Sequence, residues 1–214
     1  MNEEPRHGRA ATAAEEKETA RIEAFSDGVF AIAITLLILE LKIPRDVPEG
    51  QLFAALLHEW PAALSFVVSF LTIGIMWVNH HRLFTLIRRS DQRLLLFNGL
   101  LLFGITFVPF PTAVLSEYLR SSDARLAATF YSLTGVAIAV FFNLLWRYAA
   151  KGHRLLGDGI SPAAADDLTR QYRFGPVFYV VAAGVSQLNA IAGVAVNLAL
   201  ALFFAIPPAV MRKK

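Results

Sequence analysis

One acidic residue stands inside a long apolar segment near the N-terminus of this 214-residue chain. Residues 21–41 read RIEAFSDGVFAIAITLLILEL, and Asp27 is the only ionisable residue from Phe25 to Leu39. A carboxylate in hydrocarbon is costly, so it must face protein or water and have a partner. Asp27 therefore has two candidate roles: an ion or proton site, or a hydrogen-bonded attachment to a second helix.

Two adjacent histidines, His80 and His81, follow Trp77 near the end of a second apolar segment. Adjacent helical residues point about 100° apart, so one histidine can reach Asp27 or Ser26 while the other faces the headgroups. Two imidazoles also suggest zinc, but neither has a carboxylate at i+3 or i+4 and the chain has no cysteine. We therefore expect no metal site and no cofactor, and we expect Trp77 to be a packing or interfacial aromatic.

These side chains must be positioned by membrane helices, because the composition is not that of an ordinary soluble protein. The chain is 56% hydrophobic with a mean hydropathy of +0.50, whereas soluble domains are roughly 45–50% apolar. A spanning helix needs about 20 mostly apolar residues. Six are predicted, over residues 22–41, 59–84, 94–118, 125–149, 174–187 and 189–210.

Prolines and polar residues set the ends of these segments. Pro109 and Pro111 predict a kink in the third helix, and the polar stretch Ser186–Asn189 divides a run too long for one span. Residues 1–20 are polar and mixed in charge, which predicts a disordered or loosely helical cytosolic tail. Gly152–Asp167 is predicted to be a short cytosolic loop, and residues 212–214 a basic C-terminus.

The lysines and arginines predict the orientation. Of the 20 basic residues, the segments expected outside hold Lys42, Arg45, Arg120 and Arg125, and the others lie on the side of the termini. We therefore expect a multi-pass protein of the cell (plasma or inner) membrane with both termini in the cytosol. The net charge of +3 follows from these flanking residues and does not indicate a nucleic-acid partner.

The first helix also carries an aliphatic stripe on a different face from Asp27. Its residues are spaced i, i+3, i+4 and i+7: Ile32, Thr35, Leu36 and Leu39. One interpretation, which the pattern alone favours, is a packing face with Thr35 bonded to the carbonyl of Ala31. The other is a pore wall that gates ions by dewetting over about 10 Å. Because Asp27 lies on the far side of the helix, its position favours the attachment role.

Together these residues resemble the bacterial and archaeal members of the transmembrane-protein-175 family of potassium channels. They are the R-x-x-x-F-S-D signature at Arg21, Phe25, Ser26 and Asp27; Gly28–Ile32, Thr35 and Leu39; the W-x-x-H-H-R-L-F motif from Trp77 to Phe84; and Asn98 followed by F-x-P-F-P-T from Phe107 to Thr112. The motifs cover about residues 21–118, and hydropathy and helix spacing carry the resemblance beyond them.

The resemblance implies an all-α integral membrane protein with six transmembrane helices per subunit, assembled as a homotetramer in which the first helix of each subunit lines the pore. It places the constriction at Ile32, Leu36 and Leu39, and a hydroxyl layer for permeant potassium at Thr35. The residues that it assigns to an interhelical lock are Arg21, Phe25, Ser26, Asp27, Trp77, His80, His81 and Asn98. The expected function is a potassium-permeable cation channel, weakly selective over sodium, whose partners are itself and the lipid bilayer.

Two other hypotheses remain open from the residues. A secondary transporter would use Asp27 with His80 or His81 as a proton or ion relay. A membrane enzyme would use the two histidines, although only their adjacency favours it. No internal repeat is visible and no nucleophile–base pair or phosphate loop is present, so we expect a channel and not an enzyme.

Overall fold

The computed structural model describes residues 4–207, with side chains from residue 18 onward. Within that range the chain is helical apart from its connections and one isolated bridge between Ile87 and Leu156. The elements are α1 (Glu4–Leu36), the 3₁₀ turn η1 (Leu37–Glu40), α2 (Leu52–His58), α3 (Trp60–Leu86), α4 (Gln92–Phe107), α5 (Pro109–Tyr118), α6 (Ala124–Ala150), the 3₁₀ turn η2 (Lys151–His153), α7 (Pro162–Arg173), α8 (Gly175–Leu188) and α9 (Ala190–Ala205).

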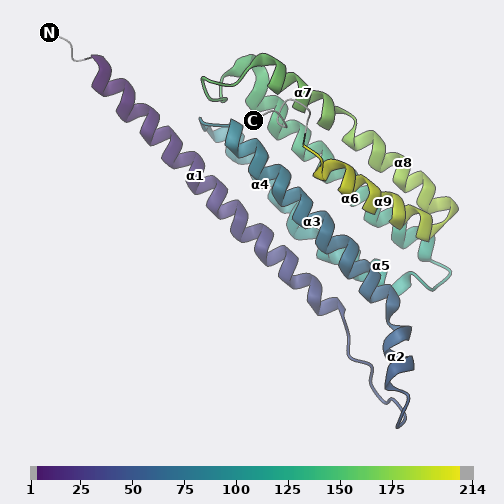
Figure 1. The fold of residues 1–214 in the computed structure, drawn as a ribbon. Helices are drawn as coiled ribbons and strands as arrows, with labels where there is room; N and C mark the ends of the chain where they lie inside the picture. The colour runs from purple at the N-terminus through teal and green to yellow at the C-terminus, as the bar shows by residue number, and fades with distance from the viewer. Residues whose placement is uncertain (1–3, 208–214) are drawn as a thin grey trace.

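The long helices form a bundle with α1 along one side (Figure 1). α6 packs against α4, α5, α8 and α9, and α1 packs against α3 and α4. Lipid offers no hydrophobic driving force between helices, so close backbone approach matters more than burial of apolar area. A Cβ on Gly104 would lie 2.9 Å from Ile138 Cγ1, and one on Gly193 would lie 2.0 Å from Ser186 Oγ. These glycines therefore let α4 approach α6 and let α9 approach α8.

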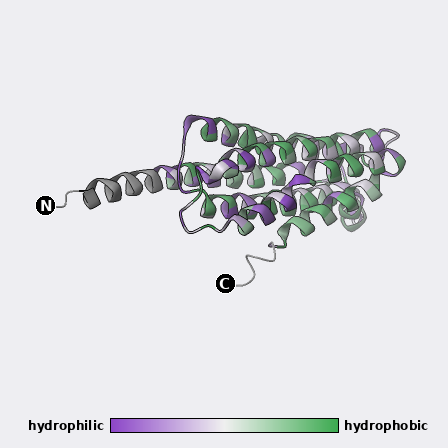
Figure 2. Cartoon of the chain, turned by 90° about the horizontal axis from the view of Figure 1, so that it is seen from above, coloured by the Kyte–Doolittle hydropathy of each residue, from purple (hydrophilic) through white to green (hydrophobic). Residues whose placement is uncertain are grey.

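Four helical segments among the described residues are long and apolar enough to cross a membrane: Glu18–Glu40, Trp60–Leu86, Gln92–Tyr118 and Ala124–His153. Figure 2 shows helices that are mostly hydrophobic along their length and connections that carry hydrophilic residues. The first four predicted spans coincide with these segments. α8 and α9 are shorter, at 14 and 16 residues, so the count of six spans remains a prediction.

Proline and asparagine divide the chain where the sequence suggested. α4 ends at Phe107 and α5 begins at Pro109, because a proline has no N–H to continue the helical hydrogen bonds. α8 and α9 are separated by Asn189, whose side chain accepts a hydrogen bond of 2.9 Å from Ala192 N. This N-cap lies inside the predicted Ser186–Asn189 break.

Residues 1–20 were expected to be a disordered or loosely helical tail, and in the structure α1 begins at Glu4; the alanine, glutamate, lysine and arginine of this stretch are strong helix formers. The structure departs from the sequence prediction in two later segments. α7 occupies part of the predicted Gly152–Asp167 loop, because Ser161 caps the helix and Pro162 starts it. α9 ends at Ala205, short of the predicted residue 210, and the predicted basic C-terminus at 212–214 lies outside the described residues.

Candidate functional site

The aliphatic stripe of α1 is left uncovered by the described parts of the subunit. Ile32 is 60% exposed, Leu36 40% and Leu39 69%, and Thr35 is also exposed. The opposite face of α1 is buried at Ile22, Ser26, Phe30, Ala33 and Leu37. The packing interpretation of the stripe is therefore not realised inside one chain, and the stripe is free to face a lumen or another molecule.

Thr35 occupies the middle of the stripe and bonds to its own helix. Its Oγ1 donates a hydrogen bond of 2.9 Å to the carbonyl of Ile32, so the predicted partner, Ala31, is wrong by one residue. A hydroxyl has one hydrogen and two acceptor lone pairs. Because the hydrogen is directed to Ile32, the oxygen can accept from, or coordinate, whatever faces the stripe.

The C-terminal end of the stripe lies in a tighter turn than expected. The α-helix ends at Leu36 and residues Leu37–Glu40 form the 3₁₀ turn η1, whereas the sequence predicted an unbroken α-helix to residue 41. A 3₁₀ helix rises about 2.0 Å per residue in place of 1.5 Å and turns by a different angle. The face that Leu39 occupies is therefore not fixed by the α-helical wheel alone, although Leu39 is exposed like the rest of the stripe. Leu37, which is fully buried, anchors the turn.

A buried chain of hydrogen bonds joins α1 to α4 and α3. Ser26 Oγ donates to the carbonyl of Ile22 at 2.8 Å and accepts from Asn98 Nδ2 at 3.0 Å. The Asn98 amide oxygen then faces His80 Nε2 at 2.9 Å. An amide oxygen can only accept, so His80 must carry its hydrogen on Nε2. The serine, asparagine and histidine are 0%, 3% and 0% exposed, which places this chain at the centre of the contact between the three helices.

Aromatic rings enclose His80. The ring of Phe84 stacks on it with centroids 4.5 Å apart, and the ring of Phe30 lies at 5.4 Å. These contacts hold the imidazole in the orientation in which it donates to Asn98. His80 is thereby committed to the buried chain and does not contact Asp27 by any hydrogen bond in the described structure.

Two further bonds join α1 to α3 along their shared edge. Trp77 Nε1 donates to Asp27 Oδ1 at 2.8 Å, and His81 Nδ1 lies 2.6 Å from Glu23 Oε1. The sequence predicted an interhelical role for Asp27 with a histidine as its partner. Trp77 was expected to be a packing or interfacial aromatic, and only the family resemblance placed it in the interhelical lock. The available signal was the spacing: Glu23 and Asp27 are one turn apart, as are His81 and Trp77, on antiparallel neighbours.

The remaining signature residues lie elsewhere. Phe25 is 68% exposed and Arg21 is also exposed, so both lie on the side of α1 that carries the stripe and not against α3 or α4. No three His, Asp or Glu side chains of the described residues gather closely enough to hold a metal ion. The site consists of a fastened polar edge and a free aliphatic face on one helix.

Comparison with known proteins identifies relatives of this chain. The family model for the endosomal/lysosomal potassium channel TMEM175 matches residues 21–109. A potassium channel of Chamaesiphon minutus is 50% identical over 196 residues, which is 91% of this chain and 97% of the relative. A potassium channel of Streptomyces collinus is 43% identical over 188 residues, 87% of this chain and 91% of the relative.

A solved structure has the same fold. The crystal structure of a lysosomal potassium-selective channel TMEM175 homolog from Chamaesiphon minutus superposes with a TM-score of 0.81 at 49% sequence identity. The superposition covers 88% of this chain and 97% of that one. The similarity extends over the whole bundle, beyond the residues that the family model matches.

The bond between Trp77 and Asp27 predicts coupled effects on stability. We expect Trp77→Phe and Asp27→Ala each to lower the unfolding free energy by about 1–2 kcal/mol, because a hydrogen bond to a carboxylate is worth roughly 1.5–3 kcal/mol and this one is partly exposed. The double variant should lose less than the sum of the two, since both changes remove the same bond. Thermal unfolding of the purified protein in detergent measures all three.

Trp60→Phe is the matched control, because Trp60 is 43% exposed and makes no hydrogen bond through its indole in the described structure. Its unfolding temperature should stay near that of the unmodified protein. Strictly additive losses in the Trp77 and Asp27 variants would show that the bond does not contribute.

Proposed function

The chain belongs to the TMEM175 family, and on that premise we propose that it is a potassium-permeable cation channel. The observation that carries the proposal is the exposed aliphatic stripe on a helix whose other faces are fastened to its own subunit. A single helix cannot enclose an ion path, so copies of α1 from several subunits must surround one. We propose a homotetramer in which each subunit crosses the plasma or inner membrane six times, with both termini in the cytosol.

Ile32, Leu36 and Leu39 form the constriction in this proposal. Rings of aliphatic side chains exclude water from a narrow pore, and an ion can pass only when the pore is wide or wet enough. An ion that crosses such a ring must shed part of its hydration. Potassium holds its water less strongly than sodium, so the constriction favours potassium by a modest factor.

Thr35 supplies oxygen ligands within the constriction. Its hydrogen is engaged with the Ile32 carbonyl, which leaves the oxygen as an acceptor that can replace part of a permeant ion's hydration shell. Four such hydroxyls around an axis would make a layer of neutral oxygens between two layers of aliphatic side chains. This layer is the proposed site of weak potassium selectivity.

The alternative of a proton or ion relay through Asp27 and His80 or His81 has less support. Asp27 is bonded to Trp77, His80 to Asn98 and His81 to Glu23. No hydrogen bond in the described structure joins Asp27 to either histidine, so the two groups do not form a direct relay. The interhelical lock is the role that these bonds support.

Single-channel recording in a planar bilayer tests the function and the constriction together. Potassium should cross in discrete current steps, which a transporter does not produce. Ile32→Asn should enlarge the steps several-fold, because a polar side chain keeps the constriction wet.

Ile43→Asn is the matched control. Ile43 is 83% exposed but lies beyond the helical end of the stripe, so its step size should not change. Potassium flux without discrete current steps would favour the transporter. If Ile32→Asn and Ile43→Asn changed the step size equally, Ile32 would not be part of the constriction.

Thr35→Ala tests the hydroxyl layer. In a potassium/sodium gradient we expect the reversal potential to move towards zero, because loss of the oxygen ligands reduces the preference for potassium. Thr106→Ala is the control, since Thr106 Oγ1 also bonds to its own helix, at the Leu102 carbonyl 2.9 Å away, but lies on α4. An unchanged reversal potential in the Thr35 variant would exclude the hydroxyl from selectivity.

A further inference from the structure

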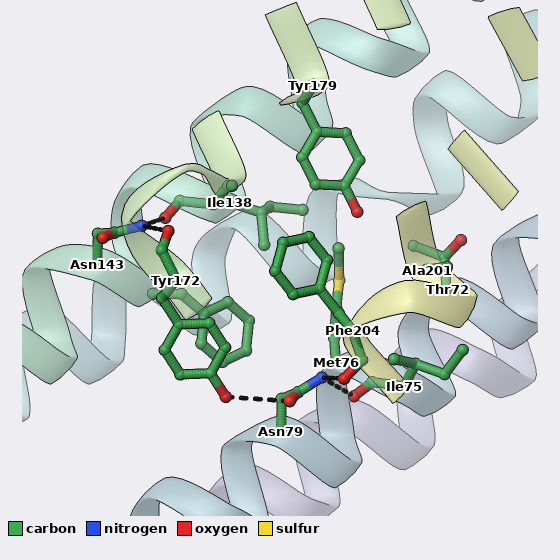
Figure 3. Close-up of a pocket in the computed structure, with 13 residues that line it drawn as sticks. Thr72, Ile75, Met76, Asn79, Ile138, Asn143, Tyr172, Tyr179, Ala201 and Phe204 are labelled. Carbon is green, nitrogen blue, oxygen red and sulfur yellow. Dashed lines mark hydrogen bonds between the residues drawn. The ribbon is translucent and has the colours of Figure 1, made fainter. Parts of the chain in front are cut away.

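Two small cavities meet inside the bundle, among α3, α6, α8 and α9. The larger has a volume of about 40 Å³ and the smaller about 10 Å³. Four residues line both of them: Thr72, Met76, Ile138 and Tyr179. Figure 3 shows the larger cavity, with the Tyr179 ring reaching from α8 and its hydroxyl directed into the space beside Phe204. Gly135 makes this possible, because a Cβ there would lie 2.5 Å from Tyr179 Cδ1.

The Tyr179 hydroxyl is a donor without a protein acceptor. Tyr179 is 6% exposed, and no side chain or carbonyl of the described residues accepts a hydrogen bond from its Oη. The other polar residues around the larger cavity are engaged: Tyr172 Oη donates to Asn79 Oδ1 at 3.0 Å, and Asn143 Nδ2 donates to two carbonyls. The Tyr179 hydroxyl is therefore a polar group at this cavity that makes no hydrogen bond to the described protein.

Asn197, which lines the smaller cavity, carries a hydrogen-bond acceptor without a donor. Its amide nitrogen donates to Ser132 Oγ at 2.7 Å and to the Gly193 carbonyl at 2.9 Å. These two bonds fix the orientation of the amide, because a carbonyl can only accept. Asn197 Oδ1 then remains a buried acceptor with no donor, on a residue that is 2% exposed. Tyr179 and Asn197, which carry a donor and an acceptor without partners, are both lining residues of the smaller cavity.

Size and charge select the ligand. One water needs roughly 10–15 Å³ of such volume, whereas benzene and xenon are known to enter a dry cavity of about 150 Å³. No charged side chain lines either cavity, which disfavours an ion. We propose that a water molecule binds where the two cavities meet, accepting a hydrogen bond from Tyr179 Oη and donating one to Asn197 Oδ1.

The hydration site is separate from the proposed pore. On α3, Trp77 and His80 bond towards α1 and α4, whereas no described residue of α1 lines either cavity. The water extends the buried polar contacts between α6 and the α8–α9 hairpin, which include those of Ser132, Ser186 and Asn197. This hydration is thus a property of each subunit and does not depend on how copies assemble.

An experimental density map at a resolution that shows ordered water tests the proposal. The unmodified protein should show a density peak within about 3.2 Å of both Tyr179 Oη and Asn197 Oδ1. Tyr179→Phe should lose the peak while keeping the backbone in place. Tyr172→Phe, whose hydroxyl bonds directly to Asn79, is the matched control and should retain it.

A map of the unmodified protein that shows both side chains as described and no peak between them would overturn the proposal, and this outcome requires no variant. A peak that persists unchanged in Tyr179→Phe would also overturn it. Potassium currents of Tyr179→Phe should equal those of the unmodified protein, so failure of the hydration site and failure of the channel proposal are distinguishable.

Discussion

Polar side chains inside a membrane must find their hydrogen bonds within the protein, and the bonds that fasten α1 to α3 and α4 satisfy this constraint. Ser26, Asn98 and His80 form a continuous buried chain whose directions are fixed by the single hydrogen of the serine hydroxyl. Asp27 and Trp77 add a bond at the edge. Together they set the rotation of α1 about its axis. Any change in that rotation would leave several polar groups unpaired at once.

This fixed rotation determines what the rest of α1 presents. With Ser26, Phe30 and Leu37 buried, the face that carries Ile32, Thr35, Leu36 and Leu39 is turned away from the subunit. The polar residues thus fasten α1 to its own subunit, and the aliphatic residues remain exposed on its other face. Such a division suits a cation channel, because an acidic side chain on the ion path would bind a cation tightly and slow its release.

The sequence predicted these features unevenly, for physical reasons. Helical periodicity placed the aliphatic stripe and Asp27 on different faces, since a long α-helix follows 100° per residue closely. The partner of Asp27 was missed because a wheel gives directions on one helix and not the register between two. The 3₁₀ turn at Leu37 and the short helices α2 and α7 were also missed, because tertiary contacts and caps decide such elements. The hydration site depends on how α6, α8 and α9 meet, which no local pattern encodes.

We propose that the exposed face of α1 lines the ion path, and the accessibility of a single introduced thiol during current recording tests this proposal. The chain has no cysteine, so a charged, water-soluble thiol reagent reports only on an introduced one. The Leu36→Cys variant should react with the reagent and lose most of its potassium current. The control is Val181→Cys, because Val181 is 56% exposed and lies on α8, which does not pack against α1 in the described structure. This variant should keep its current. If the Leu36→Cys variant reacts and its current does not change, or if the reagent blocks the Val181→Cys variant, the exposed face of α1 does not line the ion path as proposed.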